Sequence, residues 1–403
     1  MSGPDVTGRP DDVGPPQQRA TPPLDGIVVA DFSRVLAGPL ATMILADLGA
    51  DVIKVERPGV GDDTRSWGPP WRGDDSTYSL AMNRNKRSVT LDLSDPDDLV
   101  LARRLAERAD VLVENFRPGN AARFGLDHDS LSARNPGLIS ASVSGFGTGE
   151  DAAALGGYDF LIQAVSGLMS ITGDADGEPT KVGVALVDVV CGLYTAIGIQ
   201  GALAERARSG QGQQVHVSLM GASLASLVNQ ASAFLGAGVV PGRMGNRHPS
   251  IAPYETFQAA DRPFAIAVGS DRLFALLAGE LGLSELADDP RFATNADRVA
   301  NRDGLVTAMA PVLATKPAGH WVERLRARGV PAGLVNTVAE AFDEAAALGL
   351  DPIVEAPRRD GGSVPTVRSP IDLSRTPTVV DRAPPDLGEH DDEVRGWLEE
   401  PHR

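Results

Sequence analysis

The sequence predicts an α/β fold with a Rossmann-like, mostly parallel sheet, and three observations lead to this prediction. From Gly26 onward, short runs rich in Val and Ile alternate with segments of helical period. The short runs are nearly continuously apolar, which is typical of strands buried on both faces of a parallel sheet. Three of these strands end in a loop that carries Arg, Gly or Pro. Strands that alternate with helices form a sheet covered on both sides, and ligands bind beyond the carboxyl ends of its strands.

The expected elements of this first part begin with a strand at 27–32 and a helix at 39–49 that ends at Gly49. Glycine commonly closes a helix because it adopts a left-handed conformation at little cost. Asp95 and Pro96 mark the start of another helix, since aspartate caps free backbone N–H groups and proline fits the first turn. The other expected elements are strands at 51–56, 87–93, 110–116 and 138–146 and the helix at 95–109.

The second part of the chain predicts a smaller α+β domain. We expect a turn, a short strand and a long helix within 208–238, a strand at 264–270, and helices at 271–286, 303–315 and 319–328. A strand at 333–338, a helix to about 348 and a Pro-rich tail follow. The expected organisation is a disordered tail at 1–23, a large domain at 24–220, the small domain at 221–330, and a return to the large domain with the C-terminal tail at 331–403.

Composition excludes several classes of partner. A formal net charge of −17 argues against nucleic acid or an anionic membrane surface. Cys191 is the only cysteine, which suits a reducing cytosol and predicts a cytoplasmic protein. No metal-ligand spacing is present, and the first strand–helix turn lacks a G-x-G-x-x-G fingerprint, so we expect no metal and no nicotinamide cofactor. The apolar run 182–204 is long enough to span a bilayer, but a central Asp and four glycines favour a buried helix.

Asp188 is the only charged residue between Lys181 and Glu205. A carboxylate among apolar side chains costs on the order of several kcal/mol unless it is paired, hydrogen-bonded or protonated. Two interpretations follow: a helix cap or satisfied core aspartate, or a catalytic carboxylate at the mouth of a site. Separately, Arg34, Arg57 and Arg117 each follow a predicted strand, which indicates either an anion-binding rim or ordinary turn chemistry.

Eight motifs together resemble the class III CoA-transferases (CaiB/BaiF type), and they occur in that family's order. They are DFSRVLAGP from Asp31, KVERPGxGD at 54–62, NxNKRS at 83–88, DVLVENFRPG from Asp110, GYD at 157–159, the Asp188 run, GNxHP at 245–249 and the terminal LGEHxDEV. The resemblance extends from about Leu24 to about Trp397. The family includes formyl-CoA:oxalate and succinyl-CoA-dependent dicarboxylate transferases and the α-methylacyl-CoA racemases.

The resemblance implies that coenzyme A and its acyl thioesters are substrates and that Asp188 is the nucleophile. Tyr158 and Asp159 correspond to active-site positions beside it, as does Tyr78, which we expect to contact substrate together with Arg34 and His248. The positions that contact CoA in formyl-CoA transferase correspond here to Val35, Ala37, Arg57, Leu91, Asn115, Phe116 and Arg123. The family's subunits form an interlocked homodimer, with each active site between the large domain of one subunit and the small domain of the other.

Some positions depart from formyl-CoA transferase. Leu36 replaces the glutamine beside the acyl group, Ser94 and Gly156 replace two CoA-binding lysines, and GNRHP replaces a glycine-rich loop. These departures argue against the formyl-CoA and oxalate pair and leave CoA binding in place. The expected site residues also have structural interpretations: Arg57 as an ion-pair partner of Glu56, Asn115 and Phe116 as turn caps, Tyr158 as a core residue and His248 as a loop histidine.

The chemistry of CoA transfer agrees with a carboxylate nucleophile. Moving CoA between acids needs a group that can become an anhydride and then a thioester, which a carboxylate can do. Apolar neighbours would strip water from Asp188 and protect the anhydride from hydrolysis. We also expect backbone N–H groups at a helix N-terminus to bind the oxyanion. The function predicted is CoA transfer from succinyl-CoA or a similar donor to a carboxylic acid.

A 2-methylacyl-CoA racemase is the alternative reaction. It needs two opposed bases, and the family's racemases have a histidine where Tyr158 stands. A phenol, with an ordinary pKa of about 10, is a poor base at neutral pH. A non-catalytic acyl-CoA-binding protein or a dehydrogenase is a third interpretation, which the presence of Asp188 disfavours. Arg34 and Arg247 are compatible with a dicarboxylic acceptor, whose identity the sequence leaves open.

Overall fold

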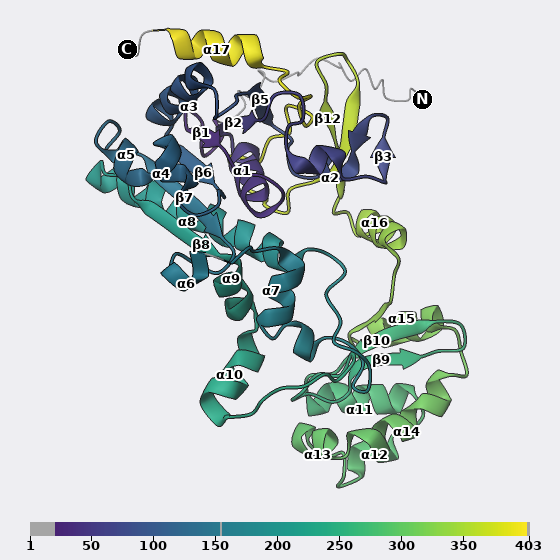
Figure 1. Cartoon of the computed structure of the whole chain (residues 1–403). Coiled ribbons are helices and arrows are strands. Elements are labelled where there is room, and N and C mark those ends of the chain that lie inside the picture. The colour runs from purple at the N-terminus through teal and green to yellow at the C-terminus, as the bar shows by residue number, and fades with distance from the viewer. Residues whose placement is uncertain (1–20, 154, 401–403) are drawn as a thin grey trace, which may run out of the picture. The chain divides into compact units, whose positions relative to one another are not determined.

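The computed structural model describes residues 21–153 and 155–400, and these fall into two compact units (Figure 1). The first unit contains the described residues up to Val143, Thr195–Val215 and those from Ile353 onward. The second contains Ser144–Tyr194 and His216–Pro352. These units divide the chain differently from the expected domains, since 144–194, 216–220 and 331–352 fall in the second unit. Residues 1–20 of the expected disordered tail lie outside the described residues.

Six strands form the large sheet, in the order β5-β2-β1-β6-β7-β8. Counting only the strands of this sheet, the order is 3-2-1-4-5-6, that of the Rossmann fold. The pairs β5–β2, β2–β1, β1–β6 and β6–β7 are parallel, which confirms the predicted α/β class and parallel sheet. The six strands are β1 (Val28–Asp31), β2 (Asp51–Glu56), β5 (Lys86–Thr90), β6 (Val111–Glu114), β7 (Ile139–Ser144) and β8 (Gln214–Ser218).

The central strands are buried on both faces, which explains their continuous apolar sequence. On one face, Ala30 and Ile53 share a core with the helices α3 (Pro96–Arg108) and α17 (Asp391–Glu399), which pack beside each other (Figure 1). On the other face, Val29 and Val52 share a core with α1 (Ala37–Asp47) and the C-terminal half of α8 (Leu186–Ser209).

The helix start predicted at Asp95 and Pro96 is confirmed in α3. The Asp95 carboxylate accepts the N–H groups of Asp97 at 2.8 Å and Asp98 at 3.2 Å, and Pro96 occupies the first turn. The long helix expected before residue 238 is wrong, since it is two helices, α9 (Leu219–Ser226) and α10 (Val228–Ala237). They divide at Val228, whose φ of +40° is incompatible with a continuous α-helix.

The Pro-rich tail expected at the C-terminal end contains regular structure. Residues after 352 form the antiparallel hairpin β12 (Ile353–Pro357) and β13 (Ser363–Val367) before α17. Val394 and Leu398 of α17 are completely buried against the large sheet's core. The C-terminal segment therefore belongs to the first unit.

The second unit contains a small antiparallel sheet in the order β11-β10-β9, packed on a helical core. Its strands are β9 (Tyr254–Gln258), β10 (Pro263–Ala267) and β11 (Ala332–Leu334). Besides the start of α8 (Leu186–Ser209), α9 and α10, it contains α6 (Glu150–Ala153), α7 (Asp159–Val165), η2 (Met169–Ile171), α11 (Asp271–Glu280), α12 (Glu285–Asp288), α13 (Asn295–Ala300), α14 (Arg302–Leu313), α15 (Ala318–Ala327) and α16 (Val338–Ala347). The first unit also has η1 (Asp63–Ser66), β3 (Trp71–Arg72), β4 (Asp75–Ser76), α2 (Thr77–Leu80), α4 (Asn120–Phe124) and α5 (His128–Ser132).

The helix α8 begins at Leu186 rather than at 182 and is buried only in part, which corrects the expectation of a buried helix. Leu193, Tyr194 and Ile197 are exposed on it. Among the described residues, α8 is the one helix long and apolar enough to cross a membrane by length and composition, a test that the core helix of a globular protein also passes.

Candidate active site

Asp188 lies in the first turn of α8, and Asp159 holds the start of that helix. One oxygen of Asp159, Oδ1, accepts the N–H groups of Val187 at 2.8 Å and of Asp188 at 3.4 Å. The other, Oδ2, accepts from Nε2 of Gln163 at 2.6 Å. Asp159 therefore caps α8 and fixes the backbone of Asp188, so the interpretation of Asp188 itself as the helix cap is wrong.

The Asp188 carboxyl is electrostatically unusual. Burial, and then the negative charge of Asp159, raise its pKa from 3.8 to about 7. No cation among the described residues offsets these two effects. A poorly solvated carboxyl that ionises near neutral pH and has no cation beside it is typical of a functional group.

The backbone N–H groups at the start of α8 are already used. Those of residues 187 and 188 go to Asp159, and those of residues 186 and 189 go to the carbonyls of Val184 and Ala185. These four N–H groups are therefore not free to bind an oxyanion, and the sequence prediction of an oxyanion site at a helix N-terminus did not name a helix.

Tyr158 and His248 belong to the same unit as Asp188. Tyr158 precedes α7 and is 68% exposed, so its interpretation as a core residue is wrong. His248 lies in a loop, where its ring packs against Tyr254 with centroids 5.2 Å apart. Its Nδ1 accepts the N–H of Ser250 at 3.1 Å, which orients the ring.

A cavity of about 330 Å³ lies in the first unit beyond the carboxyl ends of β1, β2, β5 and β6. The strand order reverses between β1 and β6, and ligands of doubly wound sheets bind at such a point. The predicted site residues that line the cavity are Arg34, Arg57, Leu91, Phe116 and Arg123. Val35, Ala37 and Asn115 lie in or beside the turn that follows β1, outside the lining.

The arginines of the cavity differ in their partners. Asp63 bridges Arg57 at 2.5 Å and Arg34 at 3.5 Å. Arg123 has no acidic partner within the described residues, and its guanidinium lies 5.5 Å from the ring centre of Phe124. An anionic ligand would therefore meet Arg123 as the most available of the three charges.

Two structural interpretations from the sequence are settled by these contacts. Glu56 pairs with Arg65 at 2.7 Å, so the alternative interpretation of Arg57 as an ion-pair partner of Glu56 is wrong. Asn115 does cap a turn: its Oδ1 accepts the N–H of Arg34 at 2.9 Å and its Nδ2 donates to the Arg34 carbonyl at 2.8 Å.

Tyr78, in the first unit, packs edge-on against Trp67, with ring centroids 5.3 Å apart.

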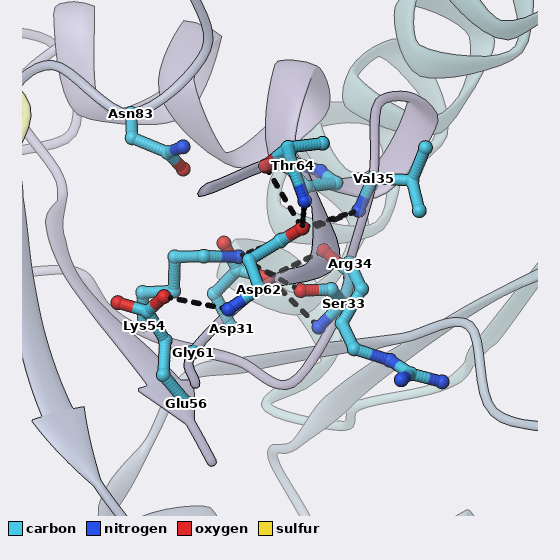
Figure 2. Close-up of polar contacts among 12 residues, drawn as sticks. Asp31, Ser33, Arg34, Val35, Lys54, Glu56, Gly61, Asp62, Thr64 and Asn83 are labelled. Atoms are coloured by element: carbon cyan, nitrogen blue, oxygen red, sulfur yellow. Dashed lines mark hydrogen bonds and ion pairs between the residues drawn. The ribbon is translucent and has the colours of Figure 1, made fainter. Parts of the chain in front are cut away.

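Sequence reasoning missed Lys54 and Asp62, which stand at the two ends of the KVERPGxGD motif. Their side chains are each 1% exposed, and Lys54 Nζ lies 2.9 Å from Asp62 Oδ2 (Figure 2). Burial alone would lower the pKa of Lys54, but Asp62 and Asp31 raise it above its ordinary value. The signal was a lysine in the middle of an apolar strand expected to be buried on both faces, where an unpaired lysine is rare.

The chain was compared with known proteins. The family model described as CoA-transferase family III matches residues 24–391. A succinate–glutarate CoA-transferase of Agrobacterium fabrum is 44% identical over 391 residues, covering 94% of this chain and 96% of its own length. An acetyl-CoA:oxalate CoA-transferase of Acetobacter aceti is 46% identical over 320 residues, covering 79% and 82%. A solved CAIB/BAIF family protein from Brucella suis has a TM-score of 0.84 at 44% identity, covering 94% of this chain and all of its own.

Proposed function

Because the chain belongs to CoA-transferase family III and is an enzyme of that class, we propose that it moves CoA from succinyl-CoA or a similar donor to a dicarboxylic acid. The Agrobacterium and Acetobacter relatives are named for pairs of this kind. The observation that carries the proposal is the Asp188 carboxyl, which is poorly solvated, unpaired by any cation in the described residues, and has a pKa raised to about 7 by burial and Asp159.

In the proposed reaction, an Asp188 oxygen attacks the thioester carbon of the donor. The C–S bond breaks, CoA leaves as its thiolate, and the donor's acyl group remains on Asp188 as a mixed anhydride. The thiolate then attacks the Asp188 carbonyl carbon, which releases the donor acid as a carboxylate and leaves an aspartyl–CoA thioester. The acceptor carboxylate repeats the two steps in reverse order, so the new acyl-CoA forms and the Asp188 carboxylate is restored.

The environment of Asp188 suits each of these steps. Poor solvation makes the ionised carboxylate reactive and limits hydrolysis of the anhydride. At neutral pH a group with a pKa of about 7 is ionised in a large fraction of molecules, so it can act without a separate base. Asp159 is a positioning residue here, since it holds the backbone of Asp188, and its charge adds to the effect of burial in raising the pKa of Asp188.

The cavity of the first unit is the proposed site for the phosphates and base of CoA. Arg34, Arg57 and Arg123 supply positive charge for the phosphates. Leu91 and Phe116 form an apolar part of the cavity wall, against which the base can pack. The overall negative charge of the chain makes such a local cluster necessary for binding an anionic substrate.

We also propose that the working form is an interlocked homodimer. Exposed apolar side chains on α8 and α10 support this, since a second copy would remove them from water. They are Leu193, Tyr194, Ile197, Val228, Phe234 and Leu235. Sedimentation at nanomolar concentration should give a dimer, and a stable active monomer would contradict the proposal.

A panel of acids tests the proposed reaction. The purified protein is incubated with succinyl-CoA, acetyl-CoA or free CoA and each of oxalate, glutarate, mesaconate and acetate, and the products are identified by mass spectrometry. New acyl-CoA should form from an acyl-CoA donor and at least one dicarboxylic acid, and none should form from free CoA. Hydrolysis to free CoA without transfer to any acid would refute the assignment.

A further inference from the structure

We propose that Lys54 and Asp62 are positioning residues that hold the turn Ser33–Val35 in the conformation that binds acyl-CoA, an inference that rests on the proposed function. Both residues lie in the wall of the cavity, yet their side chains are each 1% exposed. A ligand cannot reach groups so deeply buried, so any effect on binding has to pass through the residues that they contact.

Side chains hold the backbone of this turn at each residue (Figure 2). Lys54 Nζ donates to the carbonyl of Ser33 at 3.0 Å and to Asp62 Oδ2 at 2.9 Å. The Val35 N–H donates to both carboxylate oxygens of Asp62, at 3.2 and 3.3 Å. The N–H and carbonyl of Arg34 are bound by the amide of Asn115, as described above. Asp31 Oδ1 also accepts the Ser33 N–H, at 3.0 Å. Four side chains from outside the turn therefore fix its backbone.

The turn needs this support because Val35 has a φ of +71°. A β-branched residue is strained in the left-handed region, and such strain persists only where surrounding contacts over-determine the conformation. Asp62 is itself held in place, since the N–H and hydroxyl of Thr64 donate to its Oδ1 at 3.0 and 2.9 Å. The rigid carboxylate thus opposes relaxation of Val35 to a negative φ.

The location of the turn connects this support to binding. It joins β1 to α1 at the point where the strand order of the sheet reverses. Arg34 within it lines the cavity, and Ala37 begins the helix that follows. Relaxation of Val35 would rotate the peptide groups on either side of it and displace Arg34 from the cavity.

The variant Asp62→Asn tests the proposal. It keeps the size of the side chain but replaces one acceptor oxygen by a donor, which then faces Lys54 or the Val35 N–H. The matched control is Asp47→Asn, since Asp47 is equally buried in the same unit and its carboxylate binds Arg84 and Asn85 instead of the turn. CoA affinity is measured by calorimetry, and kcat and KM by steady-state kinetics.

Asp62→Asn should weaken CoA binding and raise KM for acyl-CoA by about tenfold, with kcat at saturation reduced by less than about threefold. Asp47→Asn should change affinity by less than about twofold, although both variants lower the melting temperature. A double-mutant cycle with Val35→Gly adds a sharper readout. Glycine adopts a positive φ without support, so Asp62→Asn should weaken binding less in the Val35→Gly background.

Several results would overturn the proposal. The first is an unchanged CoA affinity in folded Asp62→Asn, and the second is an equal loss of CoA affinity in the control Asp47→Asn. The third is a double-mutant cycle in which the effects of Asp62→Asn and Val35→Gly on CoA binding simply add. If Asp62→Asn is insoluble, Lys54→Met tests the same contacts with a side chain of similar length and should likewise raise KM more than it lowers kcat. If Asp62→Asn and Lys54→Met were both insoluble while Asp47→Asn was soluble, Lys54 and Asp62 would be needed for folding alone and the proposal would be wrong. Absence of CoA binding to the unmodified protein would instead refute the proposed function.

Discussion

Replacing Asp188 by asparagine is expected to remove activity and yet stabilise the protein at alkaline pH. Burial and the charge of Asp159 raise the pKa of Asp188 from 3.8 to about 7. At 1.36 kcal/mol per pH unit, a difference of about 3 pH units means that the charged carboxylate destabilises the folded state by about 4 kcal/mol. Asparagine has nearly the same shape and no charge, so the variant lacks this destabilisation.

The sign of the pH dependence follows from the raised pKa. Asp188 binds its proton more tightly in the folded protein than in the unfolded chain. Its contribution to the free energy of unfolding is therefore fully present below about pH 4. It is lost as the pH rises through about 7, the pKa in the folded protein. Between pH 5 and pH 8, the stability of Asp188→Asn relative to the unmodified protein should therefore grow by about 2–3 kcal/mol.

The assay is urea unfolding of the ligand-free protein at pH 5, 6.5 and 8. Asp151→Asn serves as the control, because Asp151 is an exposed carboxylate in the same unit. The control should show no such growth with pH. A difference between Asp188→Asn and the unmodified protein that is constant with pH would refute the reasoning, since it would mean that Asp188 ionises alike in the folded and unfolded states.

Two further predictions concern ligand contacts and reaction class. Arg123→Ala should raise KM for acyl-CoA by about tenfold or more, as loss of a charge-assisted contact of about 1.5–3 kcal/mol implies. Arg57→Ala should raise it less, because Asp63 already pairs with Arg57. The control is Arg134→Ala, an exposed arginine paired with Glu107 outside the cavity, which should leave KM unchanged. If KM were unchanged in Arg123→Ala and Arg57→Ala as well, the phosphates would lie elsewhere. Incubation with a (2R)-methylacyl-CoA in deuterated water should give neither inversion nor deuterium at C2, since a phenol at Tyr158 replaces the racemase histidine. Rapid deuterium incorporation would favour the racemase.

The strands of the large sheet could be predicted from the sequence because burial on both faces makes them continuously apolar. β2 spans 51–56 as expected, and β1 differs by one residue at each end. The helix α17 could not be predicted, because only Val394 and Leu398 of its charged sequence are completely buried. The break at Val228 depends on a backbone conformation that a valine in an apolar helical pattern does not indicate.

The candidate site was predictable where a single residue conflicts with its neighbours. Asp188 stands out as the one charge in a long apolar run, but its contact with Asp159, which is 29 positions away, depends on the fold. Lys54 and Asp62 were within a recognised motif, yet their pairing depends on the path of the loop between them. Patterns along the chain indicate burial, whereas partners depend on tertiary structure.

Trapping the enzyme-bound acyl group tests the central claim, that Asp188 is the nucleophile. The protein is treated with succinyl-CoA and then hydroxylamine, digested, and examined by mass spectrometry. The peptide that contains Asp188 should carry a hydroxamate on that residue, and the modification should be absent without donor and in Asp188→Ala, which should also lose transfer activity. An unmodified Asp188 in a protein that transfers CoA, or near-normal turnover by Asp188→Ala, would contradict the account.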